Sequence, residues 1–243
     1  MQQRAGAGRS SSESSENLLR IDMHVHSAYS RDSAIPARTI FQSWKRTGII
    51  PLVCDHDTLE GSLRVMRAIH AEDPGIPRVL AEEVTTAEGE VIGIFLTEEI
   101  PPGLSAADTV DLIHGQGGLS LVPHPFCDYR SKVLRAGTRN ALVEEIDLVE
   151  GHNARTVTAG EDRLGIVFAA EMGIPFTVGS DAHLPFELGR VWMEVPPFDG
   201  PRELLRGLAG APFSFRRMNR GVHLVTKVVK RVRWLPKDRW GSP

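Results

Sequence analysis

Imidazole and carboxylate side chains recur in four short stretches of this chain, each at the end of an apolar run. The stretches are DMHVHS at Asp22–Ser27, CDHD at Cys54–Asp57, VPHPF at Val122–Phe126 and GSDAH at Gly179–His183. Imidazole suits zinc and iron, and carboxylate oxygen suits manganese and magnesium. The recurrence therefore predicts a cluster of divalent metal ions bound by residues that are far apart in the sequence.

The apolar runs in front of these stretches indicate how the ligands come together. LLRI, IIPLVC, LSLV and IPFTV are short and continuous, which is typical of strands buried in a parallel sheet. In a (β/α) barrel the carboxyl ends of all such strands meet on one face. We therefore expect the four stretches to converge on one pocket.

Helical patterns alternate with the strands. Helices are predicted at residues 36–47, 59–72, 106–114 and 160–171, with a helix end at 142–145, and strands at 119–122, 146–150 and 175–178. Pro36 stands at a helix start, and Gly48 and Gly173 follow helix ends. This alternation with short links predicts an α/β fold built on a parallel sheet or barrel.

One segment breaks the alternation. Arg78–Val84 and Glu90–Leu96 read as two strands around the Gly-containing turn Thr85–Gly89. We expect an antiparallel hairpin inserted in the series, with Glu83 and Glu90 near each other across it.

Composition bounds the class of protein. At 243 residues, with 41% hydrophobic and 24% charged residues, the chain suits one barrel-sized globular domain. Two cysteines, Cys54 and Cys127, are too few for a disulfide framework and are expected to be small buried residues. This usage favours a reducing compartment, and we predict a cytoplasmic protein.

The two ends of the chain differ from its centre. Residues 1–17 are rich in Ser, Gly and Glu without an apolar block, which predicts a disordered leader and neither a signal peptide nor a transmembrane segment. Residues 18–215 form the expected barrel domain. Residues 216–243 contain nine Lys or Arg and one acid, which gives this tail a net charge of +8. Since the whole chain has a net charge of −3, the remainder carries −11.

The basic tail is also loosely amphipathic, because apolar and cationic residues interleave over Val222–Trp234. It could lie on an anionic membrane, follow a nucleic-acid backbone, or dock its apolar stripe on the acidic barrel. We favour docking within the molecule, since the +8 tail and the −11 body attract one another.

Taken in order, the motifs resemble those of the polymerase and histidinol phosphatase (PHP) family. They are HVH at His24–His26, DHD at Asp55–Asp57, a Glu in EEVTT, PHP at Pro123–Pro125 and GSDAH at Gly179–His183, and the resemblance covers about residues 21–195. It implies a distorted (β/α)7-type barrel, here with one inserted β-hairpin. It also implies a phosphoesterase with two or three divalent ions, most often Mn, Fe or Zn, with Mg possible.

The resemblance implies the following metal ligands: His24, His26, Asp32, His56, Glu83, Glu90, His124, Asp181 and His183. Strand alternation turns only one of Glu82 and Glu83 inward, and Glu83 is preferred because it aligns with the family's position. Glu90 stands where many relatives have a histidine, so it either replaces that ligand or faces water while one metal is weakly held or absent. Asp32 comes one residue later than the Asp of relatives with a shorter loop and is only a candidate. Beside His56, Asp57 is expected to cap the helix that begins near Thr58.

Three residues are candidates for catalysis. His124 is expected to be a ligand, with a second possible role in proton transfer. Arg130 and Arg155 follow strand ends and could grip phosphate oxygens in bidentate fashion, or form salt bridges with Glu144, Glu145 or Glu161. Glu150 and His152 alternate onto one face of a strand and are further candidates for the pocket wall.

The implied reaction is hydrolysis of a phosphate ester by a metal-activated water, without a Ser or Cys nucleophile. No phosphate-binding Gly-rich loop or G-x-S-x-G elbow is present in the sequence, which disfavours nucleotide-driven transfer and serine hydrolysis. The expected substrate is a small phosphorylated molecule such as a phosphomonoester, a nucleotide or the end of a short RNA. The alternative is a metal-stabilised module that binds a phosphorylated ligand or nucleic acid without turnover.

Overall fold

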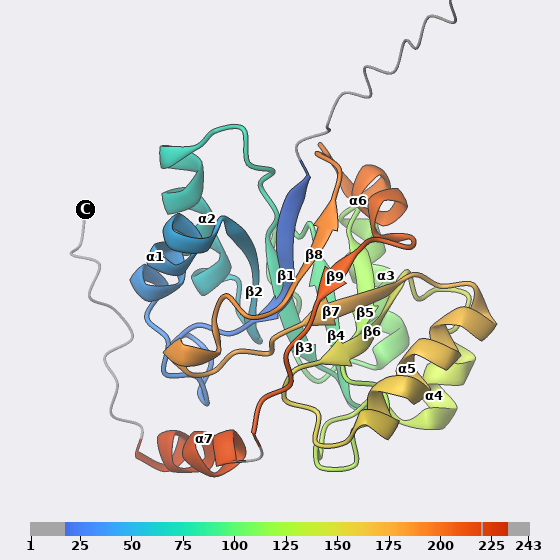
Figure 1. Ribbon diagram of the computed structural model, residues 1–243. Helices are drawn as coiled ribbons and strands as arrows, with labels where there is room; N and C mark the ends of the chain where they lie inside the picture. The colour runs from blue at the N-terminus through green and yellow to red at the C-terminus, as the bar shows by residue number, and fades with distance from the viewer. Residues whose placement is uncertain (1–17, 220, 233–243) are drawn as a thin grey trace, which may run out of the picture.

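A computed structural model describes residues 18–219 and 221–232. The predicted leader and residues 233–243 of the tail lie outside the described residues. Within the described part, nine strands form one sheet in the order β7-β6-β5-β4-β3-β2-β1-β8-β9 (Figure 1). They are β1 (Leu19–Val25), β2 (Ile49–His56), β3 (Ala81–Thr85), β4 (Glu90–Ile94), β5 (Leu119–Val122), β6 (Leu148–Asn153), β7 (Phe176–Gly179), β8 (Trp192–Val195) and β9 (Phe213–Ser214).

Helices connect the strands and flank the sheet. They are α1 (Ala37–Thr47), α2 (Glu60–Glu72), α3 (Ala106–Gly115), α4 (Ala136–Ala141), α5 (Ala159–Met172), the 3-10 turn η1 (Pro185–Glu187), α6 (Pro201–Leu208) and α7 (Gly221–Val232). Figure 1 shows α1 and α2 on one flank, α4 and α5 on the opposite flank, and α7 at the end toward which β1 runs. Among the described residues, no helix is long and apolar enough to cross a bilayer.

The sheet curls until its first and seventh strands approach each other. β1 pairs in parallel with β2, and an isolated parallel bridge joins Val25 to Ala182 just beyond β7. β4 is antiparallel to both β3 and β5, so the predicted hairpin is confirmed. The result is a nearly closed, distorted α/β barrel, as expected from the alternating pattern.

The helix signals in the sequence act where they were expected. Gly48 and Gly173 end α1 and α5 with φ of 70° and 69°, a left-handed conformation that glycine adopts without a Cβ penalty. One predicted segment is wrong: residues 142–145 are turns, because α4 already ends at Ala141. Val143 packs against the core from this turn, so an apolar residue there serves packing without a helix.

The structure also tests the expectations for the two cysteines and for Asp57. Cys54 and Cys127 are buried free thiols. Asp57 does not cap α2: Leu59 occupies the N-cap position without a side-chain cap, and the Asp57 carboxylate accepts hydrogen bonds from Thr85 N and Oγ1 at 2.7 and 3.0 Å. The carboxylate therefore ties the end of β2 to the hairpin.

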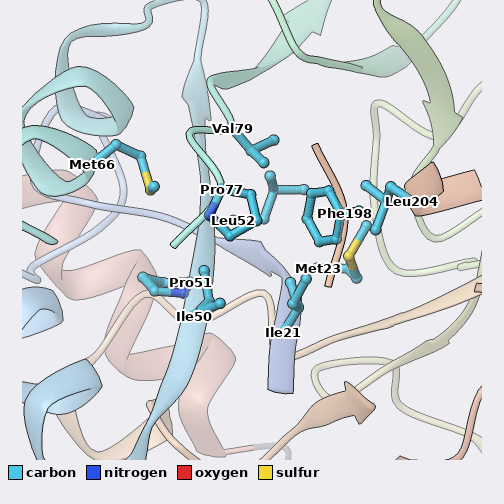
Figure 2. Close-up of a pocket in the computed structure, with 10 residues that line it drawn as sticks. All are labelled: Ile21, Met23, Ile50, Pro51, Leu52, Met66, Pro77, Val79, Phe198 and Leu204. Carbon is cyan, nitrogen blue, oxygen red and sulfur yellow. The ribbon is translucent and has the colours of Figure 1, made fainter. Parts of the chain in front are cut away.

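The interior of the sheet is apolar toward the amino ends of the strands. Figure 2 shows a small pocket of about 10 Å³ there, lined entirely by hydrocarbon and thioether side chains such as Ile21, Ile50 and Phe198. Such a wall offers no group for acid, base or metal chemistry. The buried polar side chains gather instead at the carboxyl ends of the strands.

Candidate metal centre

The first group of polar side chains surrounds the end of β1. His24 Nε2 and His26 Nε2 lie 3.0 Å apart. His26 Nε2 is 3.2 Å from Glu83 Oε2 and 3.4 Å from Asp181 Oδ1, and His24 Nε2 is 3.6 and 3.7 Å from the same two atoms. All four side chains are fully buried. Two imidazoles and two carboxylates from three strand ends thus face one point.

A second group shares Glu83 with the first. Glu83 Oε2 lies 3.2 Å from His56 Nδ1, whereas Glu83 Oε1 lies 3.2 Å from His124 Nε2. Glu90 reaches the same two histidines, with Oε1 3.5 Å from His56 Nδ1 and Oε2 3.8 Å from His124 Nε2. Glu83 Oε2 therefore faces the first group and His56, whereas Oε1 faces His124, and the hairpin brings Glu90 beside Glu83 as expected.

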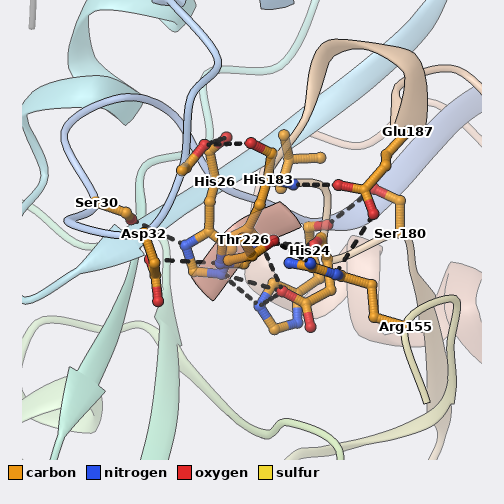
Figure 3. A network of polar contacts seen from close by, with 12 residues as sticks. His24, His26, Ser30, Asp32, Arg155, Ser180, His183, Glu187 and Thr226 are labelled. Atoms are coloured by element: carbon orange, nitrogen blue, oxygen red, sulfur yellow. Dashed lines mark hydrogen bonds and ion pairs between the residues drawn. The ribbon is translucent and has the colours of Figure 1, made fainter. Parts of the chain in front are cut away.

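The third group lies toward solvent. Asp32 Oδ2 is 3.5 Å from His56 Nε2, and Asp32 Oδ1 is 3.4 Å from His183 Nε2. The His183 ring also lies close to that of His26, with centroids 4.4 Å apart and the ring planes tilted by 42°. The structure thus brings all nine predicted ligands into one continuous cluster. Figure 3 labels four of them, His24, His26, Asp32 and His183.

The donor set fits divalent ions. Three ligand groups have donor atoms within 4.8 Å of one another: His26 with His56 and His183, His56 with Glu83 and Glu90, and His24 with His26 and Cys54. Within the described chain, Glu83 Oε2, His56 Nδ1 and Asp181 Oδ1 are buried without a hydrogen-bond partner. Buried polar atoms normally have a partner. Lone pairs that converge in this way suit a cation better than a proton.

The protonation states of His183, His124 and Glu83 suit metal binding, whereas for His56 burial is outweighed by the charge of Glu83, which raises the pKa to about 9. Burial, together with the charge of Arg155, lowers the pKa of His183 to about 3. Burial and the charge of Arg130 lower the pKa of His124 to about 4. For Glu83, burial acts to raise the pKa, but the charges of His56 and His24 outweigh it and hold the pKa well below its ordinary value. Two neutral imidazoles and an ionised carboxylate are ready to act as ligands.

Glu150 supports the inner ligands from behind. Its Oε1 lies 3.0 Å from His24 Nδ1, and its Oε2 accepts hydrogen bonds from His124 N at 2.8 Å and Asn153 Nδ2 at 2.9 Å. Asn153 Nδ2 also donates to Asp181 Oδ2 at 3.1 Å. A carboxylate on the far nitrogen fixes the orientation of a ligating imidazole. Glu150 therefore orients the His24 imidazole, holds the backbone of His124 and, through Asn153, supports one aspartate.

Asp55 supports the other side. It accepts hydrogen bonds from Ser27 N, Ser27 Oγ and Ser30 Oγ at 2.7, 2.5 and 2.7 Å. Ser30 Oγ lies 3.0 Å from His26 Nδ1 and accepts a hydrogen bond from His56 N at 3.0 Å. The loop after β1 is thereby locked to β2. In the sequence, Asp55 stands beside His56 in DHD, which was the available signal for this role.

Two ligands stand on unusual backbone. His124 and Asp181 have φ of 33° and 51°, a region that residues with a Cβ rarely adopt. Asp181 N donates to His24 O at 2.7 Å, and His124 N donates to Glu150, so hydrogen bonds hold both conformations. Such conformations cost about 1 to 3 kcal/mol each and cluster at functional sites. Here they turn each side chain back into the barrel mouth.

The two arginines occupy different places. Arg130 lies at the mouth, where its guanidinium pairs closely with Asp181. Arg155 is buried, and its Nε lies 3.4 Å from Glu187 Oε1 while its Nη2 donates to Val222 O and Thr226 Oγ1 of α7 (Figure 3). Its acidic partner is therefore Glu187, not one of the three glutamates considered from the sequence.

Glu187 connects Arg155 to the cluster. Its Oε2 accepts hydrogen bonds from His183 N and Leu184 N, both at 2.8 Å. Glu187 thus holds the backbone of the loop that carries His183. By contrast, His152 does not join Glu150: the β6–β7 register shifts between them, and His152 Nδ1 lies 3.4 Å from Asp162 Oδ2 instead.

An open cavity of about 740 Å³ leads to the outer ligands. Asp32, His56 and Glu90 contribute to its lining, together with the cationic side chains Arg130 and Lys132. Its remaining walls include Tyr29, Arg31, Asp57, Thr58, Glu60, Tyr129 and Ser131. Lys132 Nζ lies 3.4 Å from Glu90 Oε1. The lining thus carries three cationic side chains, Arg31, Arg130 and Lys132, alongside the acidic Asp57 and Glu60.

Comparisons with known proteins agree with this architecture. A family model described as PHP-associated matches residues 161–210. The chain is 31% identical over 199 residues to the uncharacterised protein MJ0417 of Methanocaldococcus jannaschii, covering 77% of this chain and 78% of that protein. A second uncharacterised protein of that organism, MJ1587, is 33% identical over 147 residues, covering 56% and 82%.

Among solved structures, the fold resembles that of a two-domain protein from Bacteroides vulgatus containing a predicted PHP-like metal-dependent phosphoesterase. The TM-score is 0.67 at 17% identity, and the match covers 82% of this chain and 65% of that one. The chain thus spans slightly less than two thirds of that protein's length.

Proposed function

The chain belongs to the PHP family, and from this premise we propose that it hydrolyses phosphate esters with divalent metal ions bound by its nine-residue cluster. The observation that carries the proposal is the shared carboxylate of Glu83. Its two oxygens face different histidines, which is the arrangement needed to bridge two ions.

We assign the cluster to three ion positions. His24, His26, Glu83 and Asp181 would hold the innermost ion. Glu83, Glu90 and His124 would hold a second. Asp32, His56 and His183 would hold the outermost. The mixture of imidazole and carboxylate favours Mn, Fe or Zn, with Mg the weaker candidate.

Divalent ions, when bound, acidify water and neutralise the charge that develops on phosphate oxygens. The protein's own groups then position the ester. Arg130 lines the cavity, and its planar guanidinium suits two oxygens of one phosphate. His124 serves as a ligand, because its Nε2 faces Glu83 and Glu90 rather than the cavity.

Arg155 acts by positioning. It is only 3% exposed and is not among the residues that line the cavity. Its contacts to Glu187 and α7 hold the loop that carries His183. We therefore assign phosphate binding to Arg130 and support of His183 to Arg155.

The expected substrate class follows from the cavity. At about 740 Å³ it exceeds the size of a phosphate group, so it suits a phosphomonoester with an organic moiety, a nucleotide or the end of a short RNA. The free thiols of Cys54 and Cys127 agree with action in the cytoplasm.

The test is phosphate release from a broad panel of phosphate esters by protein loaded with Mn²⁺. The double variant His24→Ala with Asp181→Ala should abolish the activity together with metal binding. His70→Ala, an exposed histidine on α2, is the matched control and should keep both. If the loaded protein binds ions and phosphorylated ligands but releases no phosphate, the enzyme proposal fails and a non-catalytic binding module replaces it.

A further inference from the structure

Helix α7 contacts the barrel through only part of its surface. Val222 is 6% exposed, and Thr226, one turn later, receives the hydrogen bond from Arg155. Between them, His223 Nε2 lies 2.8 Å from Arg155 O. Residues four apart lie on the same face of a helix. This face fixes how the helix is oriented against the rest of the molecule.

A row of apolar side chains points away from that contact. Leu224 is 69% exposed, Val225 46% and Val228 54%. Leu224 and Val228 are four residues apart, and Val225 and Val228 are three apart, so the row is continuous along the helix. Docking thus covers Val222 and leaves these three side chains in water. We call Leu224, Val225 and Val228 the outer apolar row.

A basic row runs beside the outer apolar row. Lys227 and Arg231 are exposed and follow Leu224 and Val228 by three residues each. The sequence of α7, GVHLVTKVVKRV, contains no acidic residue. Apolar side chains flanked by cations along one exposed helix surface match a bilayer interface that carries negative lipid headgroups.

Other partners fit these rows less well. Sequence-tolerant binding of single-stranded nucleic acid uses aromatic side chains for stacking, whereas the described exposed row is aliphatic. A second copy of the chain would bring Lys227 and Arg231 near the same charges in a two-fold contact. We propose that α7 binds the surface of an anionic membrane through the outer apolar row and the basic row beside it.

Co-sedimentation of the full chain with vesicles tests this proposal. Binding should be strong with vesicles of phosphatidylcholine containing 30% phosphatidylserine and weak with phosphatidylcholine alone. Raising the salt concentration should weaken it. The double variant Leu224→Glu with Val228→Glu should lower the partition coefficient at least tenfold. Replacing Lys227 or Arg231 by Gln should lower it roughly fivefold each, as expected for one cation near an anionic surface.

The control is Leu164→Glu, since Leu164 is 52% exposed on α5 and lies outside both rows. It should bind vesicles like the unchanged chain. Circular dichroism and metal content should be the same for all variants; if the double glutamate variant misfolds, the two Gln variants decide alone. The proposal is overturned if the protein ignores anionic vesicles, or binds neutral ones equally well. It is also overturned if the α7 variants instead abolish binding of a single-stranded RNA or break a dimer.

Discussion

The inner and outer parts of the metal cluster are built differently. We define the inner half as His24, Glu83 and Asp181, whose side chains are fully buried, and the outer half as Asp32, His56 and Glu90, with side-chain exposures of 14%, 18% and 4%. The inner half is fixed from behind by Glu150 and Asn153, whereas the outer half lines the cavity. We infer that the inner half retains ions and the outer half meets the substrate.

The largest effect should follow loss of the shared carboxylate. Glu83→Gln removes the negative charge that faces both sides of the cluster. Mutating a residue that only supports the ligands lowers metal affinity by up to about 100-fold, so loss of this ligand should lower metal affinity and the rate of phosphate release by more than about 100-fold. The control is Glu82→Gln. Glu82 is equally buried but points elsewhere and accepts a hydrogen bond from Ile100 N at 3.1 Å. Equal loss in both variants would contradict the assignment.

Glu150→Gln should weaken the inner half indirectly. The amide keeps the shape of the side chain but loses the charge that orients His24, so metal affinity should fall about 10- to 100-fold. Isothermal titration with Mn²⁺ measures this change. Glu145→Gln, an exposed glutamate, should leave affinity unchanged. An unchanged affinity in Glu150→Gln would show that the inner half does not depend on its support.

Glu90→Gln should have a smaller effect and one confined to the outer half. Glu90 contacts His56 and His124 at longer distances than Glu83 does, and Lys132 already offsets part of its charge. We expect the ion that Glu90 helps to hold to be lost, and the innermost ion to be retained. Elemental analysis after dialysis measures both. Loss of every ion would erase the distinction between the two halves.

Lys132→Gln should have the smallest effect. Its side chain is 48% exposed, and exposed ion pairs contribute about 0 to 1 kcal/mol, so KM for a phosphate ester should rise by no more than about fivefold with kcat unchanged. Lys45→Gln, an exposed lysine paired with Glu72 on the distant flank, provides the comparison. A large fall in kcat would place Lys132 in the chemistry rather than at the entrance.

The sequence predicts the strands and the clustered ligands well because both depend on short-range patterns. Apolar runs ending in His24, His56 and His124 mark strand ends, and strand ends of a barrel converge whatever the connecting loops do. The hairpin follows from its turn residues in the same way. These features require no knowledge of which loops touch.

The features for which the structure differs from the sequence prediction are those that depend on long-range packing. The shift of register in β6 separates Glu150 from His152, although strict alternation would keep them together. Arg155 pairs with Glu187 because α7 and η1 enclose it, and neither contact has a local signal. Asp57 binds the neighbouring strand instead of capping its own helix for the same reason.

The most direct test of the account is the rate of phosphate release during stepwise addition of Mn²⁺ to metal-free protein, with bound Mn²⁺ counted at each step. We predict that hydrolysis rises as the cluster fills and reaches its plateau at two or three bound ions per chain. A rate that stays at background while two or three ions bind would contradict the proposed phosphoesterase activity.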